Sequence, residues 1–231
     1  MEATATQPAR WGREVKTLRH ARREFARRRS PWMMSAAIVA LVVARLVIGD
    51  LGWRDAAAVG AMLVVYPFGE WAIHVYLLHM RPFRLRGRVI EPPAARDHRA
   101  HHEAPNDLTM ILLEEKELAQ LLFLAVPAVV GVGALVVSLV SAPLPIGAAV
   151  SAALAGYVAI FAYEWTHFLI HTAYRPRSRY YRAIWRNHRL HHFKNEHFWH
   201  GITNNVSDRV LGTNPGARDV PKSRTARTLE R

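Results

Sequence analysis

Four apolar segments constrain this chain more than any other feature of its sequence. They cover residues 32–48, 56–80, 118–140 and 144–170. Each is close to the ~20 residues that an α-helix needs to cross the hydrocarbon core of a bilayer. The alternative is four buried helices of a soluble bundle, but the third segment has no polar face to turn toward water. The sequence therefore predicts an all-α integral membrane protein with four transmembrane helices.

The distribution of arginine predicts how these helices are oriented. The chain carries a formal net charge of +13, and residues 10–29 alone hold eight arginines and one lysine. Residues 81–99 and the region after Arg175 are also basic, whereas the connections at 50–55 and 141–145 are short and together hold one arginine. Because basic loops stay in the cytoplasm, we expect a multi-pass protein with both termini cytoplasmic. A basic chain can bind nucleic acid or an anionic membrane face, and the apolar segments favour the membrane, so we expect no nucleic-acid partner.

Both ends of the chain are polar. Residues 1–30 are predicted as a basic N-terminal segment, partly an amphipathic helix at 13–29 on the membrane surface. Its apolar side chains, Val15, Leu18 and Phe25, are expected to face lipid. Residues 214–231 are predicted as a polar C-terminal tail, disordered from about Pro215.

Residues at the two ends of the first apolar segment predict local structure. Ser30 and Pro31 are typical of a helix start, with Ser as the N-cap and Pro at the first helical position. Arg45 lies near the far end of the segment, where its guanidinium could reach the lipid headgroups.

The thirteen histidines follow a pattern that random scatter does not explain. Five lie between His74 and His102, five lie between His167 and His192, and only three lie elsewhere. Each window begins with Glu-Trp, continues with two histidines at the end of an apolar segment, and closes with an H-x-x-H-H triplet in a basic region. The pattern predicts two helical hairpins that bring their histidines to the same cytoplasmic face.

The spacing within these sets suits metal coordination. His167 and His171 are four residues apart and share one face of a helix. In each triplet the first residue is one turn from the other two, which diverge by about 100°, so one triplet can serve two metals. His74 and His79 are five residues apart, so they either serve different metals or are realigned by a π-bulge.

Ten imidazoles exceed the roughly four to six ligands that one transition metal takes, so the sequence favours two ions. The candidate ligands are His74, His79, His98, His101, His102, His167, His171, His188, His191 and His192. The absence of cysteine excludes thiolate sites. Imidazole suits Fe, Zn, Cu and Ni alike. A headgroup-binding face and an acid-sensing cluster are the alternatives without metal.

Four further polar residues are candidates for supporting roles. Glu70 and Glu164 precede the histidine pairs, and each either accepts the second ring proton of a ligand or is an ordinary helix-end group. His197 and His200 fall outside the repeat. We expect them to line the substrate channel or to hydrogen-bond to ligand rings.

The segments HVYLLH, HRAHH, HFLIH and HRLHH resemble the histidine boxes of the fatty acid hydroxylase and sterol desaturase superfamily, a group of integral-membrane di-iron enzymes. The resemblance covers residues 68–213. Beyond the boxes it includes residues 175–193, 201–203 and 208–213. Two positions depart from the family pattern: His200 stands where an aromatic residue is common, and Ser207 stands where Trp is common. Both changes bear on the substrate channel, so the resemblance does not name the particular lipid.

The resemblance implies a non-haem di-iron centre that uses O₂ to hydroxylate an unactivated C–H bond of a membrane lipid, with a fatty acyl chain as the expected substrate. It carries the ligand role to the ten histidines, with Zn able to replace Fe in recombinant protein. It implies a separate ferredoxin or cytochrome-type electron donor with its reductase. Residues 31–213 would then be the membrane-embedded hydroxylase domain, with the di-metal site in a cytoplasmic helical cap. The oligomeric state is not implied.

Two alternatives stay open. The same scaffold supports a desaturase or hydroxylase of lipids, sterols or carotenoids, which product analysis would separate. A non-enzymatic membrane metal-binding or transport protein would need polar residues deep in the helices, where the last two segments offer little beyond Ser138 and Ser151. For the enzyme, a further set of residues is expected either to form the mouth of a lipid cavity or to anchor the protein at the interface. These are Arg175, Arg177, Arg179, Tyr180, Tyr181 and Trp185.

Overall fold

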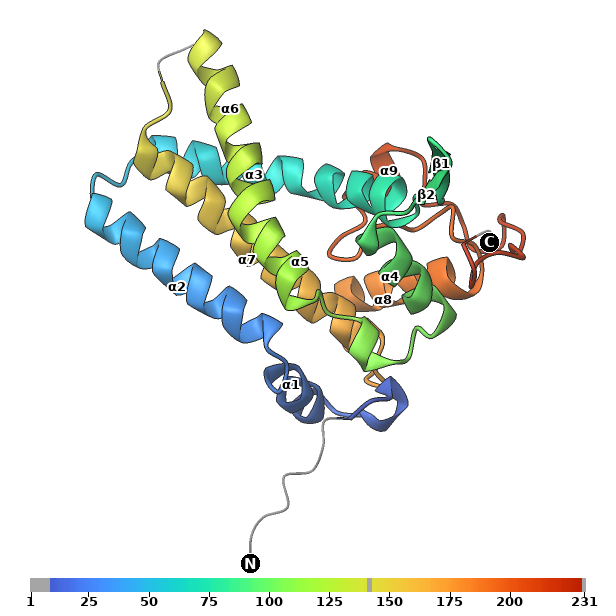
Figure 1. The fold of residues 1–231 in the computed structure, drawn as a ribbon. Helices are drawn as coiled ribbons and strands as arrows, with labels where there is room; N and C mark the ends of the chain where they lie inside the picture. The colour runs from blue at the N-terminus through green and yellow to red at the C-terminus, as the bar shows by residue number, and fades with distance from the viewer. Residues whose placement is uncertain (1–8, 141–142, 230–231) are drawn as a thin grey trace, which may run out of the picture.

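The computed structural model describes residues 9–140 and 143–229, which are mostly helical (Figure 1). The helices are α1 (Leu18–Ala26), α2 (Ser30–Ile48), α3 (Trp53–Ala72), α4 (Pro93–Glu103), α5 (Glu115–Gln120), α6 (Val126–Val140), α7 (Ile146–Ile170), α8 (Arg179–Phe193) and α9 (Val206–Val210). Two π-helical stretches, η2 (Ile73–Leu78) and η4 (Leu121–Ala125), continue α3 and α5, and short 3₁₀ turns η1 (Gly12–Glu14) and η3 (Leu108–Met110) precede α1 and α5. The sequence did not predict the small antiparallel hairpin of β1 (Phe83–Leu85) and β2 (Arg88–Ile90).

Four helical stretches in the described residues are long and apolar enough to cross a membrane, as the sequence predicts. They are Ser30–Ile48, Trp53–Leu78, Leu108–Leu139 and Ile146–Ile170. Helix α7 packs against α2, α3 and α6. Most of the large apolar side chains of the other three spans are exposed in the isolated chain, as lipid-facing positions require.

Three segments that are far apart in the sequence meet at one end of the bundle (Figure 1). The amide of Gly12 donates to the carbonyl of Asn106 (2.8 Å), and the amide of Ala173 donates to the carbonyl of Gly12 (2.9 Å). Helices α4 and α8 lie at this same end. The N-terminal segment, the central loop and the C-terminal region therefore share one end, which the sequence assigns to the cytoplasm.

The prediction that the apolar residues of the N-terminal helix face lipid is wrong. Val15 and Phe25 are buried in a core cluster that includes Leu108 and Phe168. Leu18 is partly buried against the same cluster. The Phe25 ring lies 5.1 Å from that of Trp165. The apolar face of α1 therefore covers the C-terminal end of α7 instead of the bilayer.

Arg45 also differs from its prediction. Its side chain is buried and donates to the carboxylate of Asp55 (2.7 Å) and to the hydroxyl of Ser151 (3.1 Å). A charge that is paired and hydrogen-bonded inside the protein does not need to reach the headgroups. Ser30 likewise is no N-cap: it is the first residue of α2, and its hydroxyl donates to Glu164 (3.0 Å).

The predicted disorder after Pro215 is wrong for the described residues up to 229. Val220, Ala226 and Leu229 are buried, and the amide of Ser223 donates to the carbonyl of Lys194 (2.8 Å). This segment has little regular secondary structure but lies against α4 and the end of α8, so it is part of the folded structure around the histidines.

An apolar cavity of about 680 Å³ lies between α3, α6 and α7. Its walls include Ala57, Val65, Val132 and Leu144, and Trp53 and Arg54 also border it. Trp53 begins α3, so the cavity lies toward the end of the bundle opposite the histidines.

Candidate metal centre

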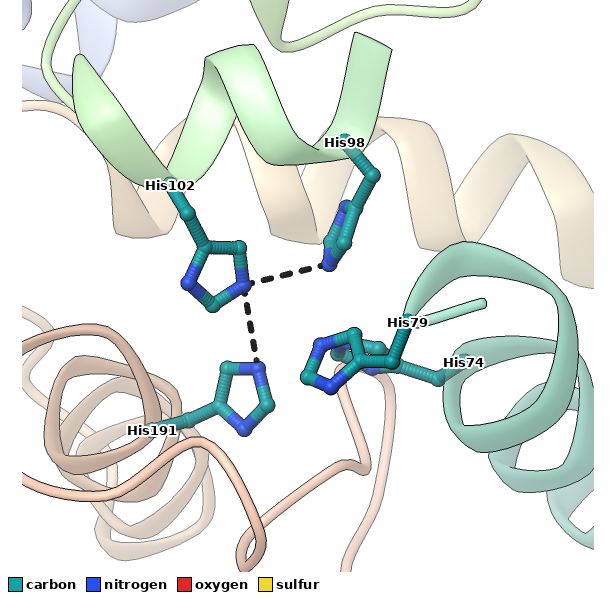
Figure 2. A group of neighbouring side chains, drawn as sticks. All are labelled: His74, His79, His98, His102 and His191. Atoms are coloured by element: carbon teal, nitrogen blue, oxygen red, sulfur yellow. Dashed lines mark hydrogen bonds between the residues drawn. The ribbon is translucent and has the colours of Figure 1, made fainter. Parts of the chain in front are cut away.

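The ten box histidines converge into two groups of five. The first histidine group is His74, His79, His98, His102 and His191, and the second histidine group is His101, His167, His171, His188 and His192. In each group one nitrogen of every ring lies within 4.8 Å of the others. Figure 2 shows the first group, with rings from η2, α4 and α8 turned toward a common point. The structure therefore brings together every histidine that the sequence nominated as a ligand.

The two triplets are shared between the groups. In α4, His98 and His102 are four residues apart and belong to the first group, whereas His101 belongs to the second. Helix α8 reverses this pattern, with His188 and His192 in the second group and His191 in the first. Adjacent residues on a helix diverge by about 100°, so each helix faces both groups at once.

The π-helix η2 explains the five-residue spacing of His74 and His79. The amide of His79 donates to the carbonyl of His74 (3.1 Å), and the two rings lie 4.9 Å apart between centroids. An i,i+5 hydrogen bond widens the turn and brings both residues to one face. Of the two alternatives that the sequence left open, the π-helical one is correct, and both histidines face the first group.

Backbone carbonyls fix the ring orientation of three histidines in the first group. The Nδ1 atoms of His74, His102 and His191 lie 2.7–2.8 Å from the carbonyl oxygens of His200, Ala226 and Phe198, respectively. A carbonyl can only accept, so each Nδ1 carries the proton and each Nε2 presents a lone pair. The Nε2 atoms of His102 and His191 nevertheless lie 3.3 Å apart (dashed in Figure 2), with no proton between neutral rings.

The second group shows the same crowding of lone pairs. The Nε2 atom of His188 lies 3.0 Å from the Nε2 atoms of both His171 and His192. A neutral ring nitrogen is either a donor or an acceptor, so His188 cannot satisfy both contacts. Buried nitrogens in both groups, including those of His101 and His167, have no hydrogen-bond partner among the described residues.

A metal ion in each group would satisfy these nitrogens. Ligand nitrogens at about 2.1 Å from one ion lie about 3.0–3.4 Å from their neighbours and at most about 4.2 Å apart. The observed separations of 3.0–3.3 Å between neighbouring Nε2 atoms match that range. The donor set is imidazole only, which suits Fe, Zn, Cu or Ni. Both groups therefore fit a transition metal.

Burial also keeps the rings in the form that binds metal. Desolvation lowers the pKa of His98, His101, His171, His188 and His191 well below its usual value of 6.5. The pKa of His102 is lowered to about 4, chiefly by burial. The rings are therefore neutral at physiological pH, as a ligand must be.

The two buried glutamates do not take up the ring protons of histidines in the described part of the chain. Glu70 accepts hydrogen bonds from the amides of Ile202 and Thr203 and from the Thr203 hydroxyl. Glu164 accepts from Ser30 and from the amide of Leu113 (3.2 Å). Each carboxylate therefore fixes a loop beside the metal centre, and the idea that they orient ligand rings directly is wrong.

The two histidines outside the repeat differ from each other. His200 is buried, with its ring 5.2 Å from that of His191, and its carbonyl accepts from His74. It lies at the edge of the first group but is not one of its five members. The side chain of His197 is 56% exposed and lies 3.6 Å from Glu196.

Asp208 is a residue of the site to which sequence reasoning gave no role. It is fully buried and accepts from the amides of His200 (2.9 Å) and Gly201 (2.7 Å). It thus holds the loop whose carbonyl orients His74. A side chain on Gly201 would place its Cβ 2.0 Å from the carbonyl of Asn204, so this loop requires glycine. The Asp-Arg-Val-Leu-Gly-Thr segment was the available signal.

A second cavity, of about 250 Å³, opens beside the first group. His79, Val75, Arg81, Glu196, His197, His200 and Leu229 line it. His197 and His200 both line this cavity, and their role in a substrate channel stays a prediction. The residues that the sequence nominated for the mouth, from Arg175 to Trp185, line neither this cavity nor the apolar one.

Comparison with known proteins places the chain among membrane hydroxylases. The fatty acid hydroxylase family model matches residues 59–213. Dihydroceramide fatty acyl 2-hydroxylase FAH2 of Arabidopsis thaliana is 26% identical over 163 residues, which are 70% of this chain and 64% of that protein. The chain thus spans less than two thirds of that relative's length.

The fold has a solved counterpart. The structure of full-length scs7p, in which only the hydroxylase domain is visible, superposes with a TM-score of 0.65 at 20% sequence identity. The match covers 84% of this chain and 68% of the other. At this identity the likeness concerns the fold alone, whereas the family match covers both histidine-bearing hairpins. The chain belongs to the fatty acid hydroxylase family.

Proposed function

We propose that the protein is a membrane-bound di-iron oxygenase that hydroxylates an acyl chain of a membrane lipid. The observation that supports it most is the pair of five-histidine groups, in which buried Nε2 lone pairs face one another at the ends of two apolar spans. Two irons bound there would supply the activation of O₂ that attack on an unactivated C–H bond requires. The assigned ligands are the ten histidines.

The protein residues would bind the metals, exclude water and position the lipid. Nine of the ten rings are buried, and His79 is half-buried where the smaller cavity meets the first group. The lining of that cavity is apolar at Val75 and Leu229 and charged at Arg81 and Glu196. We infer that one carbon of the acyl chain is held beside His79 while the polar part of the lipid contacts the charged side chains.

The location of the site at a bundle end suits a lipid substrate. Helix α3 continues into η2, which carries His74 and ends beside His79, and α7 carries His167 and ends beside His171. An acyl chain could therefore reach the first group from the bilayer without crossing water. We place this end in the cytoplasm, where a separate ferredoxin or cytochrome-type donor could deliver electrons to a basic surface.

Hydroxylation is favoured over desaturation by one comparison. The Arabidopsis relative is named as a 2-hydroxylase of a fatty acyl group, and it shares 26% identity with this chain. We therefore propose a fatty acyl group, free or within a sphingolipid, as the substrate class. Desaturation on the same scaffold would give an alkene, which product analysis distinguishes.

Metal analysis of detergent-purified protein from iron-fed cells tests the centre. We expect about two irons per chain, and fewer in the His171→Ala and His191→Ala variants. Zinc alone would still be consistent with the site, because zinc can displace iron during overexpression. A chain without any bound metal would contradict the proposal.

Lipid analysis tests the reaction. Cells that carry the gene, grown under isotopically labelled O₂, should contain a hydroxylated acyl chain with the label in its hydroxyl group. The His171→Ala variant should lack this product. Lipid extracts that are identical with and without the gene would contradict hydroxylase activity.

A further inference from the structure

We propose that residues Ser223–Leu229, the C-terminal strap, are a positioning element of the metal centre that acts on the first histidine group alone. The inference rests on the metal site of the proposed function and adds to it a part of the chain outside the family match, which ends at residue 213. The strap resembles a disordered tail in sequence, but it is packed on α4 and contacts a ligand directly.

The central contact is between the strap and His102. The carbonyl of Ala226 accepts from Nδ1 of His102 at 2.8 Å, and both residues are buried. This bond holds the proton on Nδ1 and turns Nε2 toward the other four rings of the group. Such hydrogen bonds fix the tautomer and orientation of a metal-binding histidine, and removing one commonly costs about 10–100-fold in metal affinity.

Arg227 fastens the strap to the same helix turn. Its Nε donates to the carbonyl of His102 at 2.6 Å, and its guanidinium also donates to the carbonyl of Glu103. The guanidinium lies 5.4 Å from the ring centre of Phe193 on α8. Arg227 therefore ties the strap to the end of α4 on one side and to the end of α8 on the other.

Further anchors lie at the two ends of the strap. At its start, the hydroxyls of Ser223 and Thr225 both donate to the buried carboxylate of Glu196. At its end, the buried Arg99 donates to the carbonyl of Leu229 at 2.9 Å. Leu229 and Glu196 also line the cavity beside His79. The strap thus contributes a wall of the cavity as well as a hydrogen bond to a ligand.

Within the part of the chain that the structure describes, no hydrogen bond joins the strap to a ring of the second group. His101 precedes the strap-bound residue by one position, but its ring faces His171 and His192 at 4.5 and 4.6 Å between centroids. The strap should therefore affect one ion and leave the other unchanged, which a general packing role would not do.

The test is the release of zinc from the full-length, zinc-loaded protein to a chromogenic chelator. We expect two phases in the parent chain. Arg227→Gln should accelerate one phase about tenfold. The double variant Ser223→Ala/Thr225→Val should accelerate the same phase. Arg224→Gln is the matched control. Arg224 is exposed on the same segment, and replacing it by glutamine removes the same charge as Arg227→Gln does.

Two further variants identify the phase. In a His192→Ala background the second group is impaired, and Arg227→Gln should still accelerate release of the remaining zinc. In a His191→Ala background it should not. If Arg227→Gln alone accelerates both phases, the strap has only a general packing role. If it accelerates neither phase, the strap does not position the first group. A parent protein that holds neither zinc nor iron would overturn the proposed function as well.

Discussion

The two histidine groups have the same number of ligands but are built differently. The second group takes its rings from α4, from the end of α7 and from α8, and all five are buried. In the first group, three rings are oriented by carbonyls of residues 198–226, which follow α8, and His79 borders a cavity. The second group is enclosed on all five rings, whereas the first is completed by the segment after α8 and borders a cavity through His79. We infer that the first group is the one that faces the substrate.

The largest effect should come from replacing a single ligand by alanine, in one group or in the other. His191 and His192 are neighbours on α8 but face different groups. His191→Ala should empty the first group and His192→Ala the second, each leaving about one ion per chain, and both should lower product formation at least about a hundredfold. Metal analysis and product assays measure this. Loss of both ions from either variant would show that the groups are not independent.

A glycine beside the second group should give the next largest effect. A Cβ on Gly12 would lie 1.8 Å from the carbonyl oxygen of His171. Gly12→Ala must therefore move the N-terminal segment away from the end of α7, at a cost of about 1–3 kcal/mol in the free energy of unfolding. Melting in detergent and zinc release would detect this.

Gly131→Ala is the control for that substitution. Gly131 lies in α6, and among the described residues no atom beyond its own helix turn lies within 4 Å of the Cβ that would be added there. We expect its melting temperature to stay at or above that of the parent, because alanine favours helix. For Gly12→Ala, the zinc released faster should be that of the second group. Faster release from the first group alone would contradict the prediction that the N-terminal segment supports the second group.

The two carboxylates near the groups offer a smaller and sharper comparison. Glu70→Ala would leave the amides of Ile202 and Thr203 without their acceptor, next to the loop that orients His74. Glu164→Ala would free the Ser30 hydroxyl and the Leu113 amide, which donate to this carboxylate and not to a ligand ring. Each should cost about 1–3 kcal/mol in stability. Only Glu70→Ala should also accelerate release from the first group, by up to about tenfold. Equal release from both variants would sink this distinction.

Spacing in the sequence was enough to predict the helical part of the site. The i,i+4 relation of His167 and His171 and the H-x-x-H-H triplets fix directions on a helix, so the sharing of each triplet between two ions could be derived before the structure. The apolar runs predicted the four spans for a similar reason, since length and composition are local properties.

Contacts made by backbone groups or over long separations could not be predicted in this way. The strap is polar and has no periodic pattern, and its bond to His102 uses a carbonyl that every residue possesses. Arg45 meets Ser151 across 106 positions of sequence. The amphipathic pattern of α1 marked an apolar face correctly but could not tell whether lipid or α7 covers it.

Counted per residue, the smallest effect should be the pH dependence of the metal-free protein. Burial lowers the pKa of His102 from 6.5 to about 4 and that of His188 well below 6.5. The unfolded chain therefore binds protons below pH 6.5 that the folded chain does not, so stability is complete above this value and falls toward pH 4. Between pH 7.5 and 6.0 each such imidazole should cost about 0.8 kcal/mol.

Melting of the chelator-treated protein across this range measures the slope. His102→Asn, which removes one ring whose pKa is lowered by burial, should reduce this slope. Zinc should stabilise the loaded protein most at neutral pH, and this gain should shrink as acid is added, because protons compete with the metal for the ring nitrogens. After a jump to acidic pH, the first group should release its ion faster, because His79 lies beside the cavity that admits protons. Earlier release from the second group would reverse the assignment of the open and the enclosed site.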